Sequence, residues 1–138
     1  MKATLTILLL SAMFLSSCAK RVTVSFGGGT DNVGTVKIKP STTIKGASVT
    51  MDGKLVWDKK KRIKSITVTN VPKGNHEVNV VSESWAYKES LNDKQTVKIS
   101  GSGDNKAVLV SVPPYSTGYY IYMTGIIIVC LLPSLIAL

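Results

Sequence analysis

Apolar residues form one uninterrupted run near each end of the chain and alternate with polar residues between them. Residues 3–17 and residues 121–138 contain no charged side chain. The intervening segment shows the two-residue alternation that is typical of strands, and no long stretch before residue 121 shows helical periodicity. The pattern predicts a β-rich middle with a membrane-directing segment on either side of it.

Short runs with strand composition recur through the middle of the chain and are separated by turn signals. The predicted strands are Val22–Phe26, Val33–Lys39, Ala47–Met51, Lys54–Trp57, Ser65–Val71, His76–Val81, Thr96–Ile99 and Ala107–Val112. Asp52-Gly53 is the strongest hairpin signal, because both central positions of a type I′ turn need a positive φ. We therefore predict an all-β ectodomain, an antiparallel β-sandwich of about seven or eight short strands.

The first apolar run favours export. Ala3–Leu15 is too short to span a bilayer, which needs about 20 apolar residues, and it follows a single basic residue as in a signal peptide. Leu15, Ser16, Ser17 and Cys18 then resemble a bacterial lipobox. The resemblance implies cleavage before Cys18, acylation of its thiol and, with Ala19 next, sorting to the inner leaflet of an outer membrane. The alternative is an ordinary secretory signal beside an unrelated cysteine.

The second apolar run favours a transmembrane helix. Residues 121–138 would give about 27 Å of helix, which just matches a hydrocarbon core. Four tyrosines cluster at its start, where amphipathic rings lie at the headgroup level of a membrane. They are Tyr115, Tyr119, Tyr120 and Tyr122. A buried core helix is the weaker alternative, because the run is apolar on all sides rather than along one stripe.

The polar residues between the two runs suggest no enzyme. His76 is the only histidine, and no serine or cysteine nucleophile signature accompanies it. We expect His76 to form local hydrogen bonds beside the Pro72–Asn75 turn. With one histidine and no Asp-rich loop, the sequence predicts no metal site, no cofactor and no small-molecule substrate.

Positive charge is the remaining chemical signal. The chain has 17 basic and 8 acidic side chains, and removal of Lys2 with the signal peptide leaves a mature chain of about +8. The densest basic cluster is Lys59, Lys60, Lys61 and Arg62 with Lys64. For an exported protein we expect it to bind an anionic lipid surface rather than nucleic acid, and the alternative is a solvated hairpin loop. Trp57 and Trp85 are predicted to be core residues, with an interfacial anchor as the alternative.

Part of the middle resembles PEGA-type and related carbohydrate-binding-like sandwich modules. The matching segments are Gly46–Val49, Asp52–Lys54 and Val71–Val78. Two features of the module are missing. Lys59–Arg62 stands where the module has a Gly-x-Thr-Pro segment, and Trp85-Ala86-Tyr87 lies near the position of its Gly-Tyr pair. The resemblance implies a fold and not a function.

The order of these features along the whole chain resembles the unimolecular spanins of tailed bacteriophages. These lysis proteins link the outer and inner membranes of a Gram-negative host and fuse them once the peptidoglycan is degraded. The resemblance implies that Cys18 is the outer-membrane anchor and that residues 121–138 cross the inner membrane once, with the C-terminus in the cytoplasm. It also implies a periplasmic ectodomain. We expect this ectodomain to form a homo-oligomer through exposed strand edges, because folding one such domain releases at most about 5–15 kcal/mol.

The expected organisation has five parts. Residues 1–17 are the lipoprotein signal peptide, 18–32 the lipidated N-terminus with the first strand and a glycine-rich linker, 33–114 the periplasmic β-rich domain, 115–120 an aromatic interface segment, and 121–138 the transmembrane helix.

A second function also fits these features. The rival hypothesis is a bacterial envelope lipoprotein whose PEGA-like sandwich binds a sugar or a protein, with both anchors in one membrane.

For a spanin, the physical difficulty is the distance that one folded domain can span. A compact domain of a hundred residues has a radius of gyration of about 13 Å, whereas its extended chain reaches about 330 Å. We therefore expect the tethering state to be stretched, partly unfolded or assembled end to end.

Overall fold

The structure is a computed structural model that describes residues 19–27, 29 and 31–136, with Lys59, Lys60 and residues 130–136 described by their backbone only. The strands are β1 (Lys20–Ser25), β2 (Val33–Pro40), β3 (Ile44–Met51), β4 (Lys54–Pro72), β5 (Gly74–Ser82), β6 (Leu91–Ile99) and β7 (Asn105–Val110), and the helix is α2 (Thr117–Ile136). The predicted signal peptide and the lipobox, Cys18 included, lie outside the described residues.

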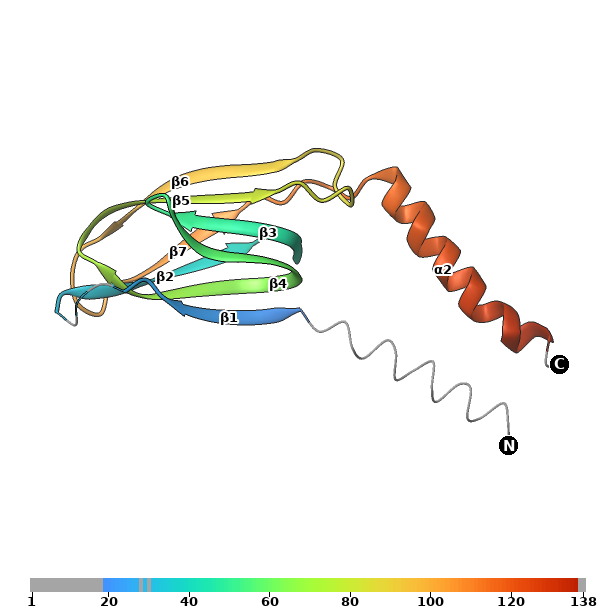
Figure 1. Ribbon diagram of the computed structural model, residues 1–138, viewed down its shortest axis with the longest axis horizontal. Coiled ribbons are helices and arrows are strands. Elements are labelled where there is room, and N and C mark those ends of the chain that lie inside the picture. The colour runs from blue at the N-terminus through green and yellow to red at the C-terminus, as the bar shows by residue number, and fades with distance from the viewer. Residues whose placement is uncertain (1–18, 28, 30, 137–138) are drawn as a thin grey trace, which may run out of the picture.

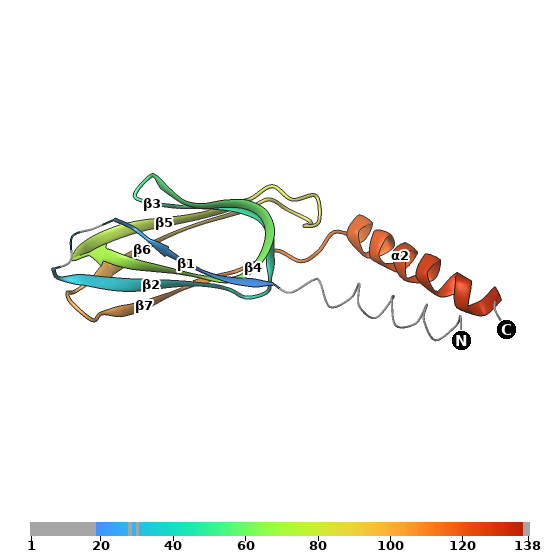
Figure 2. The same ribbon diagram turned by 60° about the horizontal axis from the view of Figure 1, so that its bottom comes forward.

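All seven strands belong to one sheet, which folds over on itself at β4. The strand order is β6-β5-β3-β4-β2-β7, and β1 pairs with β4 beside this path. The first half of β4 pairs with β3, and its second half pairs with β2 and β1. The sheet therefore forms two layers, with β6, β5 and β3 in one and β7, β2 and β1 in the other, as Figures 1 and 2 show.

The core lies between these layers and follows the predicted alternation. Every second residue of the central strands is fully buried, because successive side chains of a strand point to opposite faces. Members of the core are Val36 and Ile38 of β2, Val49 and Met51 of β3, Ile66 and Val68 of β4, Val78 and Val80 of β5, Ile99 of β6 and Val110 of β7. The prediction of an all-β ectodomain is confirmed.

Two details of the predicted fold are wrong. The sheet is mixed rather than antiparallel, since β1 with β4 and β2 with β7 are parallel pairs. The two strands predicted on either side of the basic cluster are one 19-residue strand, so Lys59–Lys64 is not a hairpin loop. Within this segment the strand pairs with β3 and, from Ile63, also with β1, and these pairings outweigh the preference of a charged run for a loop.

The turn between β3 and β4 has the predicted geometry. Asp52 has φ 51° and Gly53 has φ 75°, as a type I′ turn requires. Near the start of β3, Gly46 has φ 63° at a register shift between β3 and β4, where a residue without a Cβ carries the bulge at no steric cost. The hairpin signal in the sequence thus corresponds to a real hairpin.

The helix α2 begins at Thr117, so residues 117–120 of the predicted interface segment are helical. Within the part of the chain that the structure describes, no helix reaches the length and apolarity that crossing a membrane requires.

Gly34 in β2 sits where a side chain has no room. A Cβ there would lie 2.7 Å from the Asp104 carbonyl oxygen and 2.7 Å from Ile99 Cγ2. We expect Gly34→Ala to lower the free energy of unfolding by about 1–3 kcal/mol, since overpacking displaces neighbouring backbone. Gly101→Ala is the matched control, because nothing lies within 4 Å of its added Cβ. Urea denaturation of both variants measures the difference, and equal stabilities would contradict this packing.

Candidate functional site: an aromatic and basic cluster at one end of the sandwich

The segments that lead to the two predicted anchors are attached to the same end of the sandwich. Lys20, the first residue of β1, pairs with Ile63 of β4, which also pairs with Ile44 at the start of β3. One residue before Ile63, the Arg62 Nη2 atom donates a hydrogen bond of 2.6 Å to the Tyr119 hydroxyl of α2. Figures 1 and 2 show β1 beginning and α2 leaving at this side. We call it the helix end, and the side with the Asp52–Gly53 turn the turn end.

The root of α2 is fixed to the sandwich rather than joined by a free linker. Lys88 N donates to Pro114 O over 2.9 Å, and Ser116 N donates to Ala86 O over 2.8 Å. The Ser116 hydroxyl accepts a hydrogen bond from Tyr119 N, which makes Ser116 the N-cap of the helix. These bonds tie residues 114–116 to the loop between β5 and β6 and thereby set where α2 starts.

Aromatic rings surround this root, and we call them the aromatic collar. Its members are Trp85, Tyr87, Tyr115, Tyr119, Tyr120 and Tyr122. Tyr115 stacks on Tyr119 with 4.6 Å between the ring centroids and on Tyr87 with 5.6 Å. Trp85 lies 5.7 Å from Tyr119 and 5.6 Å from Tyr122. The four tyrosines predicted at an interface thus come together, joined by two rings from the loop between β5 and β6.

The collar has a buried side and an exposed side. Tyr87 and Tyr119 are buried, whereas Trp85, Tyr120 and Tyr122 are 56%, 57% and 54% exposed. The prediction that Trp85 is a core residue is therefore wrong, because the loop after β5 places it outside both layers. Trp57 is partly buried and packs against the core, as predicted.

Basic residues adjoin the collar from β3 and β4. Lys45 pairs directly with Arg62, and Lys45 Nζ lies 5.7 Å from the centre of the Trp85 ring. Like charges opposite each other destabilise a strand pair, so the ring face and the Tyr119 hydroxyl offset this repulsion. Lys61 and Lys64 of the predicted basic cluster are exposed nearby. Sequence reasoning missed Lys45, because only the register of β3 against β4 brings it beside Arg62.

Tyr87 holds the inner side of the collar through its hydroxyl. Lys45 N donates to Tyr87 Oη over 2.8 Å, and the hydroxyl donates to Thr43 O over 3.4 Å. Burial raises the pKa of Tyr87 above its usual 10.0, and the Lys45 hydrogen bond acts in the opposite direction. The phenol therefore remains neutral in the folded chain beyond the pH at which an exposed tyrosine ionises.

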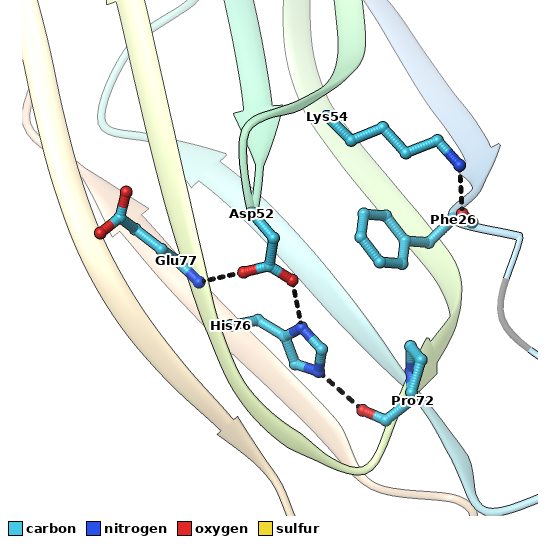
Figure 3. Close-up of polar contacts among 6 residues, drawn as sticks. All are labelled: Phe26, Asp52, Lys54, Pro72, His76 and Glu77. Atoms are coloured by element: carbon cyan, nitrogen blue, oxygen red, sulfur yellow. Dashed lines mark hydrogen bonds and ion pairs between the residues drawn. The ribbon is translucent and has the colours of Figure 1, made fainter.

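His76 lies at the turn end and links two turns (Figure 3). Its Nδ1 is 2.6 Å from Asp52 Oδ2, and its Nε2 is 2.7 Å from Pro72 O. Asp52 Oδ1 also accepts a hydrogen bond of 2.7 Å from Glu77 N. The local bonding predicted for His76 is confirmed by the Pro72 contact, and the Asp52 contact adds a tertiary link. Both ring nitrogens face oxygen acceptors, so the imidazole stabilises the turns in this geometry.

The structure gives no side-chain positions for the remaining predicted site residues. Leu15, Ser16, Ser17 and Cys18 lie outside the described residues, and Lys59 and Lys60 are placed by backbone alone within β4. Among the side chains that the structure describes, no three or more of His, Cys, Asp and Glu gather as a metal site would require. Comparisons with protein-family models, curated proteins and solved structures gave no match to this chain.

The raised pKa of Tyr87 makes stability depend on pH at the alkaline end. The folded chain keeps a proton that the unfolded chain releases above about pH 10, so the free energy of unfolding falls as the pH rises from there. Below that pH the contribution is fully present. We expect the unfolding midpoint of Tyr87→Phe to fall less steeply between about pH 9 and 11 than that of the parent chain. Parallel pH profiles would contradict a perturbed Tyr87.

Asp52 combines a turn conformation with two hydrogen bonds, and substitutions separate these roles. Asp52→Gly keeps the positive φ but removes both acceptors, so we expect a loss of about 1–3 kcal/mol in the free energy of unfolding. Asp52→Asn also tolerates the positive φ and keeps one accepting oxygen, so its loss should be smaller. Chemical denaturation checks this order, and a glycine variant as stable as the parent chain would contradict the link between the turns.

Proposed function

We propose that this chain is a spanin-type lysis protein. Cys18 anchors it in the outer membrane and residues 121–138 anchor it in the inner membrane, and the chain brings the two bilayers together after the peptidoglycan is cut. The observation that carries the proposal is the common attachment of β1 and α2 at the helix end. A folded ectodomain with both anchors at one end draws together whatever membranes hold those anchors.

The surface of α2 supports its assignment as an anchor. Ile121, Ile128 and Val129 are 69%, 55% and 66% exposed, although each is strongly apolar. Residues 126–129 are four consecutive exposed apolar positions, which point to all sides of a helix. No other described element covers them, and hydrocarbon is the environment that removes such a surface from water. The proposed span continues to Leu138, beyond the described residues.

Strand β1 can leave the sandwich without opening the core. None of its six residues is buried, and it pairs only with β4. A glycine-rich segment, 27–32, separates it from β2, and Gly27 has φ 83°. Val22 of β1 packs against the core and is only partly buried, whereas the fully buried core residues all belong to β2–β7. Docked β1 is therefore a surface strand on a glycine-rich connection, and we expect the layers formed by β2–β7 to keep their shared core when it detaches.

Detachment of β1 would reverse the direction of the lipidated end. β1 runs from the helix end to the turn end, and β2 starts at the turn end. When β1 is detached, residues 18–32 would extend outward from the turn end by up to about 50 Å. Together with the length of the sandwich, Cys18 then lies on the order of 80 Å from the root of α2. A folded domain with β1 detached thus acts as a tether, and its anchors lie farther apart than a compact domain alone would allow.

Docking of β1 on β4 would then supply the free energy that brings the two membranes together. Each backbone hydrogen bond contributes about 0.5–1.5 kcal/mol, so one six-residue ladder supplies only a few kcal/mol, and several copies must act together. The outer edge of docked β1 pairs with no strand of the described chain and offers a place for such copies to associate. The edges of β6 and β7 face each other instead, since Gln95 Nε2 donates to Leu109 O over 2.6 Å.

The envelope lipoprotein remains the second candidate, because two anchors at one end also suit a single membrane. Its sugar-binding form has less support. The groove beside β6 is lined by polar residues, leucine and proline, and contains no aromatic ring on which a sugar would stack. Its lining residues are Ser90, Leu91, Asn92, Asp93, Lys94, Ser111 and Pro113.

A reversible disulfide tests whether β1 must detach. Thr23 and Thr67 are register partners of β1 and β4, so cysteines there are within reach of a disulfide. We expect Thr23→Cys with Thr67→Cys to block lysis in a spanin-deficient phage until a reductant is added. The single Thr23→Cys variant, which keeps Cys18 and Cys130, is the control. Full lysis by the oxidised double variant would contradict a tether with detached β1.

Membrane fractionation separates the two candidates. Before the peptidoglycan is cut, a tether should be recovered from intact cells in both the inner-membrane and outer-membrane fractions, and Cys18→Ser should confine it to the inner membrane. Recovery of the unaltered chain in one membrane alone would overturn the spanin proposal and favour the envelope lipoprotein.

A further inference from the structure

We propose that the aromatic collar and the cations beside it form a docking surface for the anionic phospholipid bilayer that holds α2. The sandwich then stands with its helix end against the headgroups and has no spacer beneath it. This inference rests on the proposed function only in that α2 enters a bilayer. It adds a partner surface on the ectodomain itself, because loop and strand residues outside the predicted anchors join the tyrosines at the start of α2.

Trp85 is the residue that places the ectodomain at the headgroup level. It belongs to the loop between β5 and β6 and not to α2, yet its ring contacts Tyr119 and Tyr122 of the helix and remains 56% exposed. Rings with an apolar body and a polar tip favour the membrane–water interface. Because Ser116 caps the helix and bonds to the same loop, α2 cannot enter a bilayer without bringing Trp85 to the headgroups.

The cations around the collar match the chemistry of lipid phosphates. Lys45 and Arg62 pair across β3 and β4 beside the collar, and Lys88 is exposed in the same loop as Trp85. Lys45 forms no ion pair with a carboxylate of the described residues. Two carboxylates, Glu83 and Glu89, also lie in this loop, so basic residues from two strands and the loop are needed for a net attraction.

A bilayer is a better occupant than a protein partner because the surface continues onto α2. An open apolar face of the helix starts at Tyr122 of the collar and continues over Gly125, Ile126 and Val129. The change from cations, to tyrosine and tryptophan rings, to purely aliphatic side chains follows the order of headgroup, interface and hydrocarbon. A surface that binds a protein partner would not need this order of charged, aromatic and aliphatic side chains.

Trp85 fluorescence tests the docking in the full chain reconstituted into vesicles. Trp57→Phe leaves Trp85 as the only tryptophan. We expect lipids brominated near the headgroup to quench Trp85 more than lipids brominated deep in the acyl chains. In vesicles that contain phosphatidylglycerol, Lys45→Gln should weaken docking on the order of fivefold, since each basic residue near an anionic surface contributes about 1 kcal/mol. Lys98→Gln is the matched control, because Lys98 is exposed at the turn end.

The outcomes separate this inference from the proposed function. Unquenched Trp85 in vesicles where a probe at Val129 reports an inserted helix would overturn the docking surface and leave the anchor intact. Equal quenching of the Lys45→Gln and parent chains, or of vesicles with and without phosphatidylglycerol, would overturn the role of the cations. Quenched Trp85 in a chain that does not complement lysis supports docking while contradicting the spanin proposal. Circular dichroism of each variant verifies that the sandwich is folded.

Discussion

The continuity of β4 is the constraint on which the rest of the structure depends. One 19-residue strand takes part in both layers, first beside β3 and then between β2 and β1. The change of partners occurs around Ile63, which pairs with Ile44 on one side and with Lys20 on the other. Arg62 lies next to this point and contacts Tyr119. The strand that joins the layers therefore also positions the start of β1 and the root of α2 at one end.

Much of the fold was predictable from local pattern, and the errors have a common physical origin. Alternation identified the core strands, and Asp52-Gly53 identified the hairpin, because both signals are local. The course of β4 through Lys59–Lys64 was not predictable, since the strand is held there by ladders with distant segments and not by its own composition. The parallel pairing of β1 and of β7 likewise depends on contacts that are remote in sequence.

The candidate site divides in the same way. The tyrosine cluster was apparent from sequence, because its four members lie within eight residues at the start of an apolar run. Trp85 and Tyr87 joined the cluster only through the loop that bonds to residues 114–116, and Lys45 only through the register of β3. Two predicted features, a basic cluster and an aromatic segment, thus become one surface in the folded chain through the contact between Arg62 and Tyr119.

The topology also suggests how the proposed lysis protein would change the distance between its two anchors. A surface strand on a glycine-rich connection, directly after the proposed lipid anchor, can change the separation of the anchors while the core stays closed. In the proposed function, the membranes would approach each other through docking of one strand, repeated over several chains, and not through folding of the whole domain. Docking of the helix end on the inner membrane would direct this movement along the membrane normal.

The distance between spin labels at Arg21 and Thr117 tests the central claim most directly, when measured in cells before and after the peptidoglycan is cut. The account predicts a separation above about 50 Å while the peptidoglycan is intact, because β1 is detached and extends from the turn end. After cutting, the distance should fall to that of two residues at the same end of the sandwich. A short distance under both conditions would contradict the account, because both anchors would then lie side by side throughout.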